Sequence, residues 1–232
     1  MPVGVILMDD ESAVEGTPAE QCDKEYLLPW AVQDPAAWPV PLHTVMAKGA
    51  DSETLLQHTA GSVQSVVDSA RKLDGQVQLI IGNCGFMWAA KEQVQELVGT
   101  PTITSGLDFL DLALGMTNQQ VGLITYSAES LTALLKDHEQ RDRLRILGLS
   151  DMPDWAAIAP ADYMERGGWT MDGLREQLLD RLVHAFAENG ELAGVKILVL
   201  ECTGLANFRS EIRKVSRVPV LDIVSIAIAA IS

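Results

Sequence analysis

Short apolar runs of strand length alternate along the chain with longer stretches of helical periodicity. Val3 to Met8 and Val121 to Tyr126 are such runs, and Val77 to Gly82 and Val195 to Leu200 are two more. Leu144 to Leu149 is a fifth. Apolar runs of this kind, with no strict polar alternation, are typical of strands buried on both faces of a sheet.

Two amphipathic stretches predict the long helices. One runs from Ser52 to Leu73 and the other from Thr170 to Asn189, each beginning with a residue that favours helix N-caps. Their apolar positions recur every three or four residues: Leu55, Leu56, Val63, Val66, Val67 and Ala70 in the first, and Leu174, Leu178, Leu182 and Phe186 in the second. Strands that alternate with helices predict an α/β fold with parallel sheets covered on both faces.

The two halves of the chain repeat each other at one offset, the 118 residues that separate Cys84 from Cys202. Three further pairs lie at this offset: Val3-Gly4-Val5-Ile6 with Val121-Gly122-Leu123-Ile124, Ser52 with Thr170, and Pro101 with Pro219. Each proline opens a short predicted strand, Pro101 to Thr104 or Pro219 to Asp222. We interpret this agreement as an internal duplication.

Both repeated cysteines directly follow predicted strands. Ligands of parallel sheets bind beyond the carboxyl ends of the strands. If the two halves face each other about a pseudo-twofold axis, their strand ends share one cleft, and Cys84 and Cys202 approach it from opposite sides. Residues 9–50 and 150–169 break the regular pattern and are predicted as loops that form walls or lids of this cleft.

Composition and charge remove several classes of partner and cofactor. A net charge of -15 argues against binding to nucleic acid or to an anionic membrane surface. Three cysteines without CxxC spacing fit neither a disulfide framework nor a zinc site. Because the sequence has no GxGxxG, P-loop, HExxH or EF-hand pattern, we expect no cofactor, nucleotide or metal. The N-terminus lacks a basic leader and residues 218–232 are too short to span a bilayer, so a cytoplasmic protein is expected.

Two facing thiols suit inversion at a carbon atom beside a carboxylate or carbonyl. One base removes the α proton from one face, and a conjugate acid returns a proton to the other. Each sulfur must come within about 3–3.5 Å of that carbon, so the two sulfurs should lie roughly 6–9 Å apart. Helices expected to begin near Phe86 and Leu205 should lower the pKa of both thiols, and the N–H groups of Gly85 and of Thr203-Gly204 could hold an enolate oxygen.

At these residues the sequence resembles the aspartate/glutamate/hydantoin racemase superfamily, over essentially the whole chain. The segments that carry the resemblance are Gly82-Asn83-Cys84-Gly85-Phe86, Val121-Gly122-Leu123-Ile124-Thr125, Glu201-Cys202-Thr203 and Val218-Pro219-Val220-Leu221-Asp222. It implies two flavodoxin-like lobes with the active site in the cleft between them, a first lobe of residues 1–103 completed by 219–232, and a second lobe of residues 104–218. It also implies a homodimer.

The resemblance assigns roles to individual residues. Cys84 and Cys202 are the expected catalytic pair of a cofactor-independent racemase or isomerase. Six residues are the expected contacts of a small carboxylate, amino acid or hydantoin-like substrate: Asn83, Gly85, Thr125, Tyr126, Ser127 and Thr203. Residues 125–127 could instead only cap the helix that follows, Asp9, Asp10 and Glu201 could shape the cleft or be solvated, and Cys22 is read as core packing.

Two departures from the family pattern leave the chemistry open. Glutamate racemases usually have Asn-Thr after the first cysteine and Thr-His after the second, where this chain has Gly85-Phe86 and Thr203-Gly204. This difference argues against a glutamate racemase. A maleate-type cis–trans isomerase, an arylmalonate-type decarboxylase and a non-catalytic binding protein of the same fold remain as alternatives.

Overall fold

A computed structural model describes residues 1–9, 32–158 and 168–232. Its contacts divide the chain into two compact units. The first unit comprises Met1–Asp108 and Ile223–Ser232, and the second comprises Phe109–Asp222. The chain therefore leaves the first unit once, returns to it, and has both ends there.

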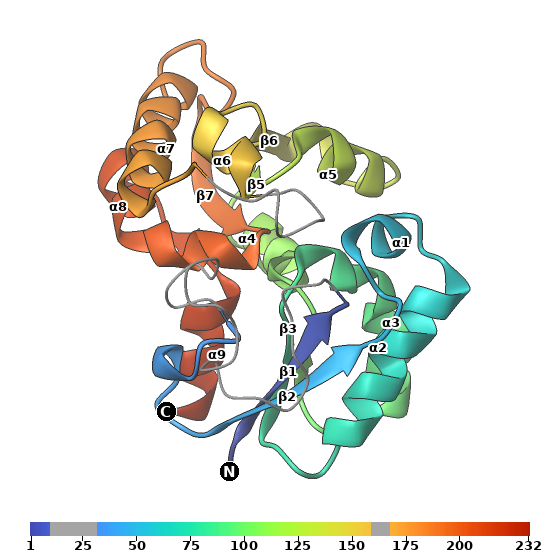
Figure 1. The fold of residues 1–232 in the computed structure, drawn as a ribbon. Helices are drawn as coiled ribbons and strands as arrows, with labels where there is room; N and C mark the ends of the chain where they lie inside the picture. Colours follow the sequence, from blue (N-terminus) through green and yellow to red (C-terminus); the bar gives the residue numbers. More distant parts are fainter. Residues whose placement is uncertain (10–31, 159–167) are drawn as a thin grey trace. The chain divides into compact units, whose positions relative to one another are not determined.

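The first unit is built on a parallel sheet with strand order β2-β1-β3-β4 (Figure 1). Its strands are β1 (Val3–Met8), β2 (Leu42–Ala47), β3 (Leu79–Gly82) and β4 (Thr102–Ile103). β1 and β3 are the two inner strands, and Val3, Val5 and Ile6 on β1 are buried. Burial on both faces explains why β1 is an unbroken apolar run.

Helices cover both faces of this sheet. α1 (Ser52–Leu56), α2 (Ala60–Leu73) and α3 (Lys91–Leu97) lie on one side, and α9 (Ile223–Ile231) lies on the other, packed against β3 (Figure 1). Three short 3₁₀ helices complete the described elements: η1 (Pro35–Ala37), η2 (Gly85–Ala90) and η3 (Gly106–Phe109). Right-handed crossovers between parallel strands place α2 and α3 on the same face.

The second unit has the same design, with strand order β6-β5-β7-β8. Its strands are β5 (Gln120–Thr125), β6 (Leu144–Gly148), β7 (Val195–Leu200) and β8 (Val220–Leu221), all parallel. Its helices are α4 (Leu110–Met116), α5 (Ala128–Leu134), η4 (Arg141–Arg143), α6 (Pro153–Ala157), α7 (Met171–Ala185), η6 (Thr203–Phe208) and α8 (Arg209–Ser216). α7 packs against α8, and α4 packs against β7.

The predicted α/β fold with parallel sheets is confirmed, and the two sheets share one strand order. The offset of 118 residues also relates η2 to η6, and the first residue of α3, Lys91, to the first residue of α8, Arg209. A common origin of the two halves stays a prediction. The second unit extends to Asp222 because β8 pairs with β7. The lobe boundaries expected after residues 103 and 218 stay a prediction.

The sequence interpretation was wrong about β2, which was assigned to the loop of residues 9–50. β2 is an edge strand whose first five residues are partly or fully exposed, with His43 and Thr44 among them. Because these polar residues interrupt it, β2 lacks the continuous apolar run by which the buried strands were predicted. The Met152-Pro153-Asp154-Trp155 segment was likewise assigned to a loop, but it opens α6, and Trp155 is buried.

The first predicted long helix is two helices. α1 ends at Leu56, His58 has a left-handed backbone (φ 52°), and Thr59 caps α2 by accepting from the Ser62 N–H. Asp51, and not Ser52, is the N-cap of α1. Thr170 caps α7 as predicted, accepting from the Gly173 N–H at 2.9 Å.

Gly82, the last residue of β3, gives a stability test. A Cβ atom there would lie 2.3 Å from the carbonyl oxygen of Thr104, a backbone atom that cannot swing away. We expect Gly82→Ala to lower the free energy of unfolding by about 1–3 kcal/mol through overpacking. Urea unfolding followed by circular dichroism measures this difference.

Gly61 supplies the matched control in the same unit. Its Cβ would meet no atom within 4 Å, and it lies in the exposed first turn of α2. Gly61→Ala should stabilise the protein by about 0.5–1 kcal/mol because alanine is the better helix former. Equal stability changes in the two variants would contradict the close approach of Gly82 and Thr104.

Candidate active site

Cys84 lies two residues beyond the carboxyl end of β3. It is the N-cap residue of η2, where the chain leaves extended geometry (φ -131°, ψ 134°), and the Met87 N–H donates to its carbonyl oxygen at 3.0 Å. The residue is partly exposed and packs against the core cluster of the first unit. Met87, the buried side chain of the same turn, anchors η2 in that core.

Asn83 fixes the end of β3 to the end of β1. Its backbone N–H donates to the Ile6 carbonyl at 3.0 Å, and its side-chain Oδ1 accepts from the Met8 N–H at 2.8 Å. The Asp9 carboxylate accepts from the Gly49 N–H at 2.7 Å, in the turn that follows β2. Gly85 is buried as the first residue of η2. Asp10 and Cys22 lie outside the described residues.

Cys202 occupies the corresponding place in the second unit. It follows β7 by two residues and is the N-cap residue of η6 (φ -71°, ψ 124°), with Thr203 as the first residue of that helix. Phe208 at the end of η6 packs against Trp155, with ring centroids 5.5 Å apart. Trp155 Nε1 donates to the Leu174 carbonyl at 3.1 Å, so α6 and α7 both hold η6 in place.

Glu201 is a buried carboxyl group beside Cys202. Its side chain is only 3% exposed, and its Oε2 accepts from the hydroxyl of Thr125, which is fully buried, at 2.7 Å. Burial raises the pKa of Glu201 to about 7, and the Thr125 hydrogen bond opposes that rise. This carboxyl group can therefore change charge near neutral pH.

The surroundings of Cys202 correct the expectation of an activated thiol. Burial, followed by the charge of Glu201, raises the pKa of Cys202 to about 12, although the backbone N–H groups of Gly204 and Leu205 act to lower it. Six residues of 3₁₀ helix do not offset the cost of ionising a sulfur beside a carboxylate. Cys202 is thus a thiol at neutral pH.

The three residues after β5 differ in their environments. Thr125 turns inward to Glu201. Burial and the neighbouring Cys202 raise the pKa of Tyr126, and the Tyr126 carbonyl accepts from the N–H groups of Leu149 and Ser150. Ser127 caps α5 by accepting from the Ser130 N–H at 3.2 Å, as the capping interpretation predicted.

The sequence did not predict two polar side chains near the cysteines as candidate ligand contacts. Trp88 Nε1 in η2 and both amide atoms of Asn207 in η6 are buried without a hydrogen-bond partner among the described residues. An unpaired buried polar group costs about 1–3 kcal/mol, so a ligand that pairs with it would be favoured. No sequence motif marks either residue.

Within residues 1–9, 32–158 and 168–232, no three His, Cys, Asp or Glu side chains are grouped as metal ligands would be. Likewise, none of the described helices has the length and apolar character needed to cross a membrane.

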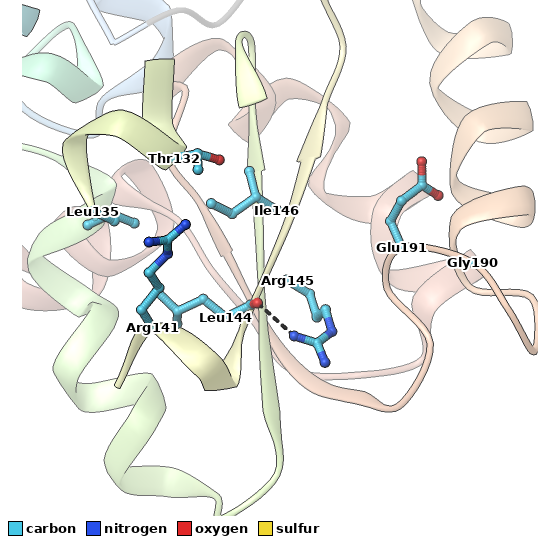
Figure 2. Close-up of a pocket in the computed structure, with 8 residues that line it drawn as sticks. All are labelled: Thr132, Leu135, Arg141, Leu144, Arg145, Ile146, Gly190 and Glu191. Atoms are coloured by element: carbon cyan, nitrogen blue, oxygen red, sulfur yellow. Dashed lines mark hydrogen bonds between the residues drawn. The ribbon is translucent and has the colours of Figure 1, made fainter. Parts of the chain in front are cut away.

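The second unit has a pocket of about 470 Å³, and Figure 2 shows the residues that line it. It is lined by Thr132, Leu135, Arg141, Leu144, Arg145, Ile146, Gly190 and Glu191. The pocket lies at the start of β6, and because the sheet is parallel this is the end opposite to the one that Glu201 and Cys202 follow. None of the residues that line it is a cysteine, so the candidate thiol of this unit lies at the other end of the sheet.

The buried carboxyl group gives a stability test with a defined sign. The pKa of Glu201 is about 7 in the folded protein, against an ordinary 4.5. The carboxyl group therefore ionises more readily in the unfolded chain, and the free energy of unfolding falls as the pH rises from the ordinary pKa through 7. A shift of this size corresponds to about 3 kcal/mol. Glu201→Gln should therefore gain stability relative to wild type between about pH 5 and about pH 8.

Urea unfolding of both proteins at the two pH values measures this gain, and comparing pH values cancels any pH-independent effect of the substitution. Glu188→Gln, at an exposed position of the same unit, is the control and should show no such gain. If the free energies of unfolding of Glu201→Gln and wild type differ by the same amount at both pH values, ionisation of Glu201 does not destabilise the folded protein.

Curated relatives in sequence are named as dimethylsulfoniopropionate lyases. The chain is 24% identical over 173 residues to "Dimethylsulfoniopropionate lyase 7" of Emiliania huxleyi (strain CCMP1516), a match that covers 70% of this chain and 49% of the lyase. "Dimethylsulfoniopropionate lyase 3" of the same organism is 25% identical over 170 residues, or 68% of this chain and 43% of the lyase. The chain thus spans about half the length of these relatives.

The fold is shared with racemases of known structure. An allantoin racemase from Klebsiella pneumoniae superimposes with a TM-score of 0.60 and 18% identity, over 100% of this chain and 86% of that chain. The sequence model of the family described as Asp/Glu/Hydantoin racemase matches residues 31–231. Nearly all of the two-sheet structure lies in that match, and the chain belongs to the Asp/Glu/Hydantoin racemase family.

Proposed function

We propose that the protein is a cofactor-independent racemase or isomerase in which Cys84 and Cys202 are opposing acid and base at the α-carbon of a small carboxylate, amino acid or hydantoin-like substrate. The observation that carries this proposal is the equivalence of the two cysteines. Each lies two residues beyond a central parallel strand and is the N-cap residue of a six-residue 3₁₀ helix. Membership in a racemase family supports the same chemistry.

The proposed reaction moves one proton each way. The thiolate of one cysteine takes the α proton, and the electron pair left on carbon is delocalised into the adjacent carbonyl or carboxylate. The thiol of the other cysteine then protonates the opposite face and becomes a thiolate. No group enters or leaves the substrate, so inversion needs only two sulfurs of opposite protonation state.

The residues around each cysteine would hold the substrate oxygens. We assign this role to the groups at the strand ends: Asn83, Gly85, Tyr126, Ser127 and Thr203. Backbone N–H groups at the first turns of η2 and η6 suit a developing enolate, because fixed dipoles need no reorganisation during the reaction. Thr125 is given a different role, since its hydroxyl is fully buried and donates to Glu201.

A lyase activity is the second candidate, favoured by the names of the curated relatives. Elimination from a sulfoniopropionate begins with the same step, removal of the proton α to the carboxylate. The electron pair then forms a carbon–carbon double bond as the carbon–sulfur bond breaks and the neutral sulfide leaves. One thiolate suffices for this sequence, so racemisation and elimination differ in what happens to the carbanion.

Proton exchange is the measurement that tests the leading proposal. In heavy water, wild-type protein should replace the α proton of its substrate with deuterium, in a panel of chiral carboxylates, amino acids and hydantoins followed by proton NMR. Cys84→Ala and Cys202→Ala should each lose inversion, since either loss leaves one face without a proton carrier. A fall of about 10²-fold or more in rate is expected for removing an acid/base group.

Cys22→Ala is the matched control, because Cys22 is the third cysteine of the chain and has no repeat partner. It should keep the wild-type exchange rate. Inversion that survives in either Cys84→Ala or Cys202→Ala would contradict the two-thiol mechanism. Binding of panel compounds without exchange would favour a binding protein, whereas release of carbon dioxide or cis–trans conversion would favour the decarboxylase or diacid isomerase.

The lyase candidate has its own assay. Protein incubated with dimethylsulfoniopropionate is expected to release dimethyl sulfide into the headspace if it shares the activity named for its relatives. Gas chromatography of wild type, Cys84→Ala and Cys202→Ala would show which thiol acts as the base. Absence of the sulfide at millimolar substrate, alongside α-proton exchange on another compound, would discard this candidate and keep the first.

A further inference from the structure

The two cysteines are preceded by different residues at equivalent positions. The offset of 118 residues carries Asn83 onto Glu201 and Ile6 onto Ile124. The backbone agrees, because the Asn83 N–H donates to the Ile6 carbonyl at 3.0 Å and the Glu201 N–H donates to the Ile124 carbonyl at 2.9 Å. One scaffold thus holds a neutral amide before one thiol and a carboxyl group before the other.

The side chains of Asn83 and Glu201 accept hydrogen bonds from different kinds of donor. In the first unit Asn83 Oδ1 accepts from a backbone N–H, that of Met8, at 2.8 Å. In the second unit Glu201 Oε2 accepts from a side-chain hydroxyl, that of Thr125, at 2.7 Å. The hydroxyl is fully buried and the carboxyl group 3% exposed, so water does little to screen a charge there.

We propose that Glu201 is a positioning residue that keeps a proton on Cys202 in the resting enzyme, so that Cys202 is the resting acid and Cys84 the resting base. This inference rests on the proposed function, since it assigns starting roles to the same two thiols. It makes the two halves of the site unequal although their backbones match.

The charges around Cys202 support this assignment. The ionisable group that faces it from the end of β5 is Tyr126, and the one from the end of β7 is Glu201. η6 offers only the N–H groups of Gly204 and Leu205. Among the described residues of this unit, no lysine, arginine or histidine compensates a charge on the sulfur, so a carboxylate at Glu201 disfavours the thiolate.

The resting protonation states of the two thiols favour one direction of proton transfer in the free enzyme. Proton removal by Cys84 and delivery by Cys202 starts from the resting state directly. The opposite direction needs the charge on Cys202, a state that a protonated Glu201 would favour because it removes the adjacent negative charge. Glu201 therefore couples the resting state of the site to pH near neutrality.

Site-resolved alkylation of the protein tests this role. Iodoacetamide reacts with thiolates, and mass spectrometry of the digest gives separate rates for Cys84 and Cys202 across neutral to mildly alkaline pH. Wild-type Cys202 should react more slowly than Cys84. Glu201→Gln should raise the Cys202 rate about tenfold, as for one unit of thiol pKa, and leave the Cys84 rate unchanged.

Two variants control the experiment. Glu188→Gln makes the same change of net charge at an exposed position and should leave both rates at wild-type values. Asn83→Asp is the mirror variant, which places a carboxyl group before Cys84 while keeping an oxygen to accept from Met8. It should slow alkylation of Cys84 and not of Cys202, and it decides the question should Glu201→Gln fail to fold.

The outcomes separate this inference from the function on which it rests. An unchanged Cys202 rate in folded Glu201→Gln, or an unchanged Cys84 rate in Asn83→Asp, overturns the role of Glu201. The two-thiol function survives that result if both cysteine variants lose α-proton exchange. Exchange that persists in those variants overturns the function itself, whatever the alkylation rates show.

Discussion

The last hydrogen bond of each central strand pair is the constraint on which both candidate half-sites depend. Beyond β3 the Asn83 N–H still binds the Ile6 carbonyl, and beyond β7 the Glu201 N–H still binds the Ile124 carbonyl. The sheet therefore controls the residue before each cysteine, and the 3₁₀ helix controls the residue after it. The backbone of each cysteine is thus held between two regular elements, a strand before it and a helix after it.

A symmetric backbone does not make the chemistry symmetric. The two units share strand order and helix placement, yet around Cys202 burial and then the carboxyl group of Glu201 raise the pKa of the thiol. The family contains enzymes that return a proton to carbon, and the curated relatives are named as lyases that break a bond. Racemases and lyases can share one fold because the fold fixes where the thiols lie, whereas the residues beside each thiol determine its pKa.

Much of this organisation could be predicted because buried parallel strands leave an unmistakable apolar pattern. β1 and β7 were predicted with their observed limits, and the repeat offset identified Cys84 and Cys202 as a pair. β2 was missed since an exposed edge strand needs no apolar run, and the break at His58 was missed since a left-handed residue leaves no mark in helical periodicity. The raised pKa of Cys202 was also missed, because the burial of the thiol, and of Glu201 beside it, depends on tertiary packing.

The helices that cover β3 and β7 are exchanged between the units. α4 follows β4 of the first sheet but packs against β7 of the second, and α9 follows β8 of the second sheet but packs against β3 of the first. A chain of half this length, with one sheet and one such final helix, could cover both faces of its sheet only in a domain-swapped dimer. In that dimer the final helix of each copy would pack against the sheet of the other copy. The strand that leads to Cys84 therefore has its apolar cover on this face only when α9, which follows the whole second unit along the chain, has packed against it.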